Sequence, residues 1–402
     1  MLPVFHRSPR ALPLIAGVLL AAAATLASGQ SLPRYTMREL IKPTGGDMCG
    51  FWGDMNANGD VVQACRFTGG TRTETVLTCL GPYATFCYNA KVKKTWTRFL
   101  PVWWPAGGSA RTLSLPIAAT VERVYLSDVG EVIATGLPID TLGYTTQSNQ
   151  VAWRVPAGST MGVDLPPPGG QPASTFALTR ASHSGHQWWS DKSDQRHLLA
   201  NAQGQSLDIA TPPTTGTVTS EEWPALGEGG QLAYSRRLYT DATRTTLINE
   251  NWLWTGQRWQ AYTLPGNAFP DMNRRASINA SGHLLITDWN SGLNLLAPER
   301  SSTPQAIQLD GALNPGLHLL DAADRAYGDA VVTGIKNVSA HALVWANGQW
   351  ADINTLVNSR PSSWHITFIR AVNARGQVLA QVNDNSRTGS AAERMVVLTP
   401  VP

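Results

Sequence analysis

The sequence predicts an all-β fold, a β-propeller of about seven four-stranded repeat units that follows an N-terminal signal peptide. A turn of the Asn-x-x-Gly type between two apolar runs recurs along the chain, which indicates repeated β-hairpins. The copies are spaced by about the length of one four-stranded sheet, and no 3.6-residue apolar period indicates a helical solenoid. A radial array of such sheets protects its own edges, so 402 residues need no second domain.

The clearest copy of the repeat runs from Phe368 to Val382, where Asn373 and Gly376 separate two apolar runs. Asn and Gly tolerate the positive φ that a tight turn demands. The same turn position is marked in the other copies by Gly59, Gly130, Gly185, Gly230, Gly282 and Asp324. Steps of about 40 to 70 residues between markers suit one blade each. We therefore expect seven blades, with six or eight as alternatives.

A second pattern follows each turn and combines a Trp, a Gly-containing turn and an alternating strand. The tryptophans in this frame are Trp104, Trp153, Trp254 and Trp345. Because they keep one position in the repeat, we expect them to pack between blades.

Closure of a propeller requires both ends of the chain to share one blade. Tyr35 to Ile41 is the one early strand-like stretch outside the first copy. We therefore predict that it pairs with Met395 to Thr399.

Residues 1–29 have the organisation of a secretory signal peptide. Arg7 and Arg10 precede an apolar run from Ala11 to Leu26, and small residues follow. This apolar core is short for a membrane span, which disfavours the alternative of a retained anchor helix. We expect the mature chain, 30–402, to be a single propeller domain without a transmembrane span, secreted or periplasmic.

The charge of the chain argues against nucleic acid as a partner. The formal net charge is +3, two of these charges lie in the predicted leader, and the remaining Lys and Arg residues are scattered. Nucleic-acid binding requires a concentrated basic surface.

Four cysteines lie near the start of the mature chain: Cys49, Cys65, Cys79 and Cys87. Export favours two disulfides, for which three pairings are open. A zinc site is the alternative, but the spacing contains no CxxC pair. Cys79 and Cys87 fall in an insertion at about 68–99 that lengthens the first unit, and insertions of this kind often carry a binding surface.

The segment from His341 to Gly348, HALVWANG, closely resembles the hallmark of the bacterial HAF extracellular repeat family. There, His-Ala-Phe leads into an apolar residue, Trp and an Asn-Gly turn. Ala371 to Val378 and Ser277 to Gly282 are similar to the other half of that repeat. Phe is replaced by Leu343, and the match is poor before Leu126. The resemblance implies an exported, propeller-like repeat protein and supplies no catalytic residues.

The first turn resembles the opening of a calcium loop, because oxygen-bearing side chains alternate around a glycine. Its candidate metal ligands are Asp54, Asn56, Asn58 and Asp60. Cys65 stands where the bidentate Glu of such a loop belongs, and other copies make this turn without acids. An ordinary Asx-rich turn is therefore favoured over Ca²⁺, and no other cofactor is expected.

No catalytic constellation recurs with the repeat. His183, His186 and His197 form a weak metal candidate, since no neighbouring Cys or Asp-His pair supports it. The sequence lacks a G-x-S-x-G elbow. Glycoside hydrolysis needs two convergent carboxylates, whereas the acids in similar repeat positions are isolated: Asp128, Asp208, Asp288 and Asp352.

Fifteen tryptophans are many, and several lie outside the repeat frame. An indole offers a flat apolar face to a sugar ring or a protein, so an exposed subset would mark a binding site. Core packing is the alternative for each of them. Besides Trp52, this group contains the candidate binding residues Trp188, Trp189, Trp223, Trp289 and Trp364.

These observations favour an exported, noncatalytic propeller that binds a protein or glycan partner at the cell envelope or outside the cell. The first alternative is a hydrolase or lyase that acts on polysaccharide at the channel, and the second is a structural cell-envelope protein. Two inward-facing carboxylates close together at the channel mouth would favour the enzyme. An exposed aromatic rim would favour the binder, and the structural protein requires neither feature.

Overall fold

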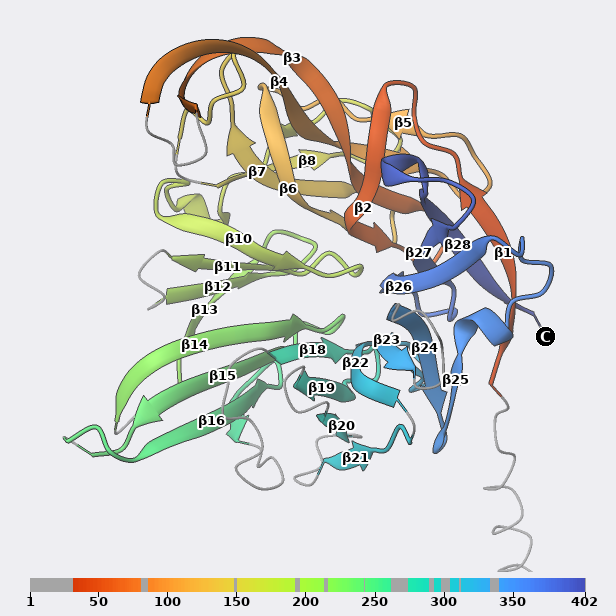
Figure 1. Cartoon of the computed structure of the whole chain (residues 1–402). Coiled ribbons are helices and arrows are strands. Elements are labelled where there is room, and N and C mark those ends of the chain that lie inside the picture. Colours follow the sequence, from red (N-terminus) through yellow and green to blue (C-terminus); the bar gives the residue numbers. More distant parts are fainter. Residues whose placement is uncertain are drawn as a thin grey trace, which may run out of the picture.

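The computed structural model describes residues 32–80, 86–147, 150–191, 196–212, 216–241, 243–261, 274–288, 293–297, 304–310, 312–332 and 340–401. These residues form seven four-stranded antiparallel sheets around a common centre (Figure 1). The chain is a seven-bladed β-propeller, as the sequence predicts. The predicted signal peptide, 1–29, lies outside the described residues.

Six blades use consecutive strands, from the innermost to the outermost. Blade 1 consists of β2 (Gly46–Met55), β3 (Val61–Leu80), β4 (Phe86–Trp104) and β5 (Arg111–Thr112). Blade 2 consists of β6 (Ala119–Leu126), β7 (Val132–Pro138), β8 (Val151–Val155) and β9 (Val163–Asp164). Blade 3 consists of β10 (Phe176–Ala181), β11 (Gln187–Asp191), β12 (Arg196–Ala200) and β13 (Ser206–Ala210). Blade 4 consists of β14 (Thr217–Leu226), β15 (Leu232–Tyr239), β16 (Leu247–Trp254) and β17 (Trp259–Ala261). Blade 5 consists of β18 (Arg274–Ile278), β19 (Leu284–Asp288), β20 (Leu293–Ala297) and β21 (Gln305–Ile307). Blade 6 consists of β22 (Ala312–Leu320), β23 (Ala326–Val332), β24 (Ala340–Ala346) and β25 (Gln349–Asp352). Three short 3₁₀ turns connect strands at Pro168–Gly170, Ile353–Thr355 and Gly389–Ala391. In the described part of the chain, no helix is long and apolar enough to cross a bilayer.

Blade 7 joins the two ends of the chain. Its strands are β26 (Trp364–Val372), β27 (Val378–Asp384), β28 (Glu393–Val401) and, outermost, β1 (Arg34–Leu40). β1 runs antiparallel to β28, and Figure 1 shows the two side by side. The predicted closure of 35–41 on 395–399 is confirmed.

The hairpin after each innermost strand has the same backbone hydrogen bonds in all seven blades. The carbonyl of its first residue accepts from the N–H three positions later, and its N–H donates to the carbonyl four positions later. The seven first residues are Asn56, Ser127, Ser182, Gly227, Asn279, Asp321 and Asn373. All seven marker residues have positive φ, including Asp324 at 59°. Asp can adopt this conformation because its short side chain tolerates the left-handed region.

Three of these turns begin with asparagine, and its side chain links neighbouring blades. Asn373 Oδ1 accepts from the N–H groups of Arg375 and Gln377, at 3.1 and 3.0 Å. Asn373 Nδ2 also donates to the carbonyl of Asn56 in blade 1, at 2.8 Å. The corresponding bonds run from Asn56 to the Ser127 carbonyl and from Asn279 to the Asp321 carbonyl, at 3.1 and 3.0 Å. One carboxamide therefore closes its own turn and fixes the next blade.

The four tryptophans of the repeat frame pack against the preceding blade, as predicted. Each lies on the third strand of its blade. Each shares a hydrophobic cluster with residues of that blade: Trp104 with Leu379 and Met395, Trp153 with Val62 and Ala64, Trp254 with Trp188 and Leu199, and Trp345 with Leu285 and Leu296. The packing of these large side chains between blades removes apolar area from water and so stabilises the contact between neighbouring blades.

In the predicted insertion, 68–99, the described residues 68–80 and 86–99 prolong the strands β3 and β4. β3 and β4 remain paired from Val61 opposite Trp104 to Leu80 opposite Phe86. The resulting hairpin extends past the other blades at the top of Figure 1. At its base, the guanidinium of Arg72 lies 4.2 Å from the centre of the Tyr144 ring in blade 2.

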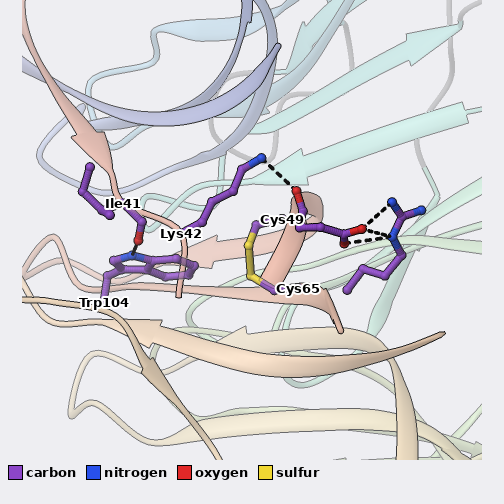
Figure 2. Close-up of a disulfide and its surroundings, with 7 residues drawn as sticks. Ile41, Lys42, Cys49, Cys65 and Trp104 are labelled. Atoms are coloured by element: carbon purple, nitrogen blue, oxygen red, sulfur yellow. Dashed lines mark hydrogen bonds and ion pairs between the residues drawn. A yellow bond between two sulfur atoms is a disulfide. The ribbon is translucent and has the colours of Figure 1, made fainter. Parts of the chain in front are cut away.

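A disulfide joins Cys49 on β2 to Cys65 on β3 (Figure 2). Farther along the hairpin, Cys79 lies opposite Cys87 in the β3–β4 register. Near the disulfide, Trp104 Nε1 donates to the carbonyl of Ile41 at 2.9 Å. These contacts hold the segment that leaves blade 7 against blade 1.

Replacing Asn373 by Ala should destabilise the protein by about 3 kcal/mol, because four side-chain hydrogen bonds are lost, including the buried one to the next blade. The matched control is Asn201→Ala. Asn201 makes the same three bonds within its own exposed turn, from Oδ1 to the N–H groups of Gln203 and Gln205 and from Nδ2 to Gln205 Oε1. Among the described contacts, it differs from Asn373 by the bond to the next blade. That change should cost about 1 kcal/mol or less. Urea denaturation measures both, and equal losses would contradict the proposed link between blades.

Replacing both Cys49 and Cys65 by Ala should lower the unfolding free energy by about 3 kcal/mol, because the bridge closes a loop with a sequence separation of 16. The measurement is the urea midpoint without reductant. Adding a reductant should lower the midpoint of the wild type more than that of the double variant. An unchanged midpoint in the variant would show that strand pairing alone holds this blade.

Candidate functional site

A cavity of about 580 Å³ lies where the carboxyl ends of the seven innermost strands converge. Its wall is formed by residues of β2, β6, β10, β14, β18, β22 and β26 and by turn residues of blades 3 to 7. The volume falls in the range of small-molecule sites. The repeated turn therefore determines which side chains surround this cavity.

The second residue of each turn shows where the repeat departs from symmetry. Four blades carry alanine there, at Ala57, Ala280, Ala322 and Ala374. The three consecutive blades 2, 3 and 4 instead carry Asp128, His183 and Glu228. Ionisable groups are thus concentrated on one side of the rim.

His183 bridges two carboxylates from different blades. Its Nε2 lies 2.8 Å from Asp54 Oδ1, and its Nδ1 lies 3.1 Å from Glu228 Oε1. The other oxygen of Asp54 accepts from the Leu126 N–H at 2.8 Å, and the other oxygen of Glu228 accepts from the Ser184 N–H at 2.7 Å. The network ties blades 1, 2, 3 and 4 together at the cavity.

The charges of this network reinforce one another. Burial on its own lowers the pKa of His183, but the charge and hydrogen bonds of Asp54 and Glu228 outweigh it and raise that pKa well above the usual range. Burial on its own raises the pKa of Glu228, yet the hydrogen bond and charge of His183 leave it below the usual value. The raised pKa of His183 favours the imidazolium form at neutral pH.

Asp54 and Glu228 are the inward-facing pair of carboxylates that the enzyme alternative requires. Both line the cavity and both contact one imidazole. A glycosidase, however, needs one carboxyl group that is protonated at working pH, with a raised pKa. Glu228 has the opposite shift. The described geometry makes this pair a structural anchor for a cation.

Three arginines also line the cavity: Arg123 on β6, Arg180 on β10 and Arg370 on β26. Arg123 spans the gap between two blades, since its guanidinium lies 5.9 Å from the centre of the Trp52 ring and its Nη1 donates to the Thr179 carbonyl at 3.5 Å. Burial lowers the pKa of Arg180, and the positive charge of Arg123 lowers it further. The two guanidinium groups therefore act on the same region of the cavity.

β-Bulges help to direct these side chains. The register of β22 shifts between Leu317 and Leu319, and that of β26 shifts between Ile369 and Ala371. The unmatched residues are His318 and Arg370, and both line the cavity. Bulges re-aim side chains in this way next to functional sites. Hydrophobic alternation in the sequence does not reveal them.

The four candidate calcium ligands are directed to separate partners. Asp54 contacts His183, and Asn56 Oδ1 accepts from the N–H groups of Asn58 and Asp60. Asn58 Nδ2 donates to the Asp128 carbonyl at 3.1 Å, and Asp60 Oδ1 accepts from the Ala106 N–H at 2.7 Å. The side-chain oxygens of Asp54, Asn56 and Asp60 are therefore engaged by different groups of the protein.

The three histidines that the sequence groups as a metal candidate are also directed apart. His186 Nδ1 lies 3.0 Å from Ser184 Oγ, and the His197 ring packs against Trp188 in blade 3. Across the ranges that the structure describes, no group of three or more His, Cys, Asp or Glu side chains is arranged to hold a metal ion.

The candidate tryptophans do not form one exposed patch. Trp188 and Trp189 are 0% and 2% exposed and belong to the core of blade 3. Trp364 is half-buried beneath the guanidinium of Arg394, 4.9 Å from its ring centre. The side chain of Trp223 and the whole of Trp289 lie outside the described residues.

Trp52, which the sequence analysis did not select, is the exposed tryptophan at the cavity. It is 50% exposed and precedes Asp54 by two positions on β2. The alternation of a strand places residues i and i+2 on one face. Aligning the seven innermost strands on their turns would have found it.

No family model matches the chain, and no curated protein matches it. Virginiamycin B lyase from Staphylococcus aureus is similar in structure, with a TM-score of 0.50 and 11% identity over 91% of this chain and 100% of that chain. The β-propeller domain of the Trilobed protease from Pyrococcus furiosus has a TM-score of 0.51 and 7% identity, over 92% and 94%. At these identities the likeness shows the fold alone.

The His183 network predicts a pH-dependent contribution to stability. A raised histidine pKa stabilises fully below its usual value of 6.5, and the effect is lost as pH rises through the raised pKa. The lowered pKa of Glu228 stabilises above its usual 4.5. His183→Gln should therefore cost about 2 kcal/mol near pH 6, and the cost should shrink as the pH is raised toward 10.

The measurement is the urea midpoint of wild type and variant between pH 5 and 10. The control is His186→Gln, two residues beyond Ser184 in the same turn, because His186 forms no ion pair with a described residue. Its cost should be small, because no ion pair between described residues is lost. A cost for His183→Gln that stays constant from pH 6 to 10 would show that the imidazole is neutral in the folded protein.

Proposed function

We propose that this protein is an exported, noncatalytic binding propeller that receives part of a protein or glycan partner in the cavity at the mouth of its channel. The observation that carries the proposal is the state of the cavity's ionisable groups. The carboxylates of Asp54 and Glu228 are both paired with His183, so this pair offers the cavity fixed charges instead of a free general acid and a free general base.

The shape of the cavity also supports binding. Its rim is set by seven turns that share one hydrogen-bonding pattern, so the lining side chains are held in place before a ligand arrives. Preorganisation of this kind reduces the entropic cost of binding. The disulfide between Cys49 and Cys65 supports export, because such bridges persist in oxidising compartments.

A hydrolase or lyase acting on polysaccharide is the second candidate, since Asp54 and Glu228 both face the cavity. Two of the similar solved structures are lyases, a virginiamycin B lyase and a streptogramin B lyase, but at 11% identity this likeness extends to the fold alone. A screen for both retention and cleavage separates the two candidates.

Retention should depend on access to the cavity. The mature chain, 30–402, is immobilised and screened against cell-wall and plant polysaccharides and against extracellular proteins, with products analysed for cleavage. Ala374→Trp fills the alanine side of the rim without changing a charge. We expect this change to lower the affinity for a retained ligand at least about tenfold. The control is Ala157→Trp in an exposed turn between β8 and β9, which should bind normally.

Retention by Ala374→Trp equal to that of wild type would place binding elsewhere and contradict the proposal. Cleavage that is lost in Asp54→Asn or Glu228→Gln would instead establish the enzyme. Because His183 anchors those two carboxylates, each such variant is first checked for an unchanged fold by circular dichroism.

A further inference from the structure

The cavity combines a cation and an aromatic face at one point. Arg123 is exposed, and its guanidinium lies 5.9 Å from the centre of the half-exposed Trp52 ring. Its described contacts, the Trp52 ring and the Thr179 carbonyl, are both uncharged. A planar guanidinium in such a position is suited to a bidentate pair with a carboxylate.

The acids that line the cavity are already paired with cationic side chains of the protein. Asp54 and Glu228 share one cation, His183. Asp321, whose side chain is 0% exposed, accepts from Arg325 Nε at 2.6 Å and from the Tyr327 hydroxyl at 3.1 Å. Arg180 adds positive charge beside Arg123, and Arg370 adds it from blade 7. The potential at the Arg123 side of the cavity therefore favours an anion.

The aromatic neighbour narrows the class of anion. The apolar CH face of a pyranose ring matches the flat face of an indole, and in a uronate the carboxylate is attached directly to that ring. In the cavity, the guanidinium that would bind the carboxylate and the indole that would contact the sugar ring likewise lie next to each other. An acidic peptide carries its carboxylates on flexible stems and presents no rigid apolar face beside them, so it uses this pair less well. A cavity of about 580 Å³ also suits the end of a sugar chain better than a folded protein surface.

We propose, resting on the binding function argued above, that the cavity binds a uronate residue of an acidic polysaccharide. Arg123 pairs with its carboxylate, Trp52 lies against its ring, and Arg180 contributes to the attraction from the neighbouring blade.

The test is calorimetric titration of the mature chain with two acidic probes, oligogalacturonate and oligoalginate, and with methyl-esterified oligogalacturonate as the uncharged match. At least one acidic probe should bind, its ester should bind at least about tenfold more weakly, and added salt should weaken the acidic complex. Failure of both acidic probes, or equal affinity for acid and ester, overturns the proposal.

Variants then assign the contacts. Arg123→Gln should weaken the acidic probe about tenfold or more, as loss of a charged hydrogen-bonded pair predicts. Arg123→Lys should recover part of this loss, since lysine keeps the positive charge but cannot form the bidentate pair. Trp52→Ala should weaken the binding of the probe independently. The control is Arg196→Gln, which breaks an exposed ion pair with Asp208 on the outer strands of blade 3 and should leave affinity unchanged. Full affinity in both Arg123→Gln and Trp52→Ala, with folding verified by the thermal midpoint, overturns the assignment.

A tri-glutamate peptide separates this proposal from the broader one. Binding of the peptide without binding of either uronate probe would overturn the uronate assignment and leave a cavity-binding propeller. If the screen instead retains a neutral glycan or a protein that Ala374→Trp blocks, the binding function stands and the uronate assignment fails. Only retention that is equal in the wild type and in Ala374→Trp counts against the binding function itself.

Discussion

The hydrogen bond from the Asn373 carboxamide to the Asn56 carbonyl shows the constraint on which the rest of the structure depends. A propeller holds together only if each innermost strand ends at the same height as its neighbours. The turn after each strand fixes that height through two backbone bonds and a residue with positive φ. Where the turn starts with asparagine, the side chain carries the constraint into the next blade. The bond from Asn373 to Asn56 does so between the last blade and the first.

Because all seven turns have the same form, the residue after each turn start lies at an equivalent place on the rim. Alanine occupies it in four blades, and Asp128, His183 and Glu228 occupy it in the other three. A symmetric scaffold therefore carries an asymmetric site. The double ion pair of His183 has a structural consequence as well, since it links blades 1, 3 and 4. On blade 2, the exposed guanidinium of Arg123 lines the same cavity.

The features that the sequence predicted are those set by local backbone chemistry or by counting. Asp324 could be placed as a turn marker because few residue types tolerate positive φ. The pairing of β1 with β28 followed from one unassigned strand in a fold that must close. The interblade position of Trp104 followed from its constant place in the repeat.

The site depends on contacts that local patterns do not contain. Asp54 resembles a calcium ligand because of its sequence neighbours, yet its partner His183 lies 129 residues away in another blade. Trp188 and Trp189 were selected for lying outside the repeat frame, which carries no information on burial. The bulges that direct His318 and Arg370 leave no mark in the hydrophobic alternation.

Native-state hydrogen exchange tests the interblade constraint most directly. The amides of Gln377, Asp60 and His283 each donate to the side-chain oxygen of a turn asparagine at 3.0 Å. The amide of Gln205 makes the same bond at the same distance in the exposed turn of Asn201. The first three amides should exchange only when the whole propeller unfolds, whereas that of Gln205 should exchange by local opening. Equal exchange rates at the four amides would contradict it, because the link to the next blade would then add nothing to the turn.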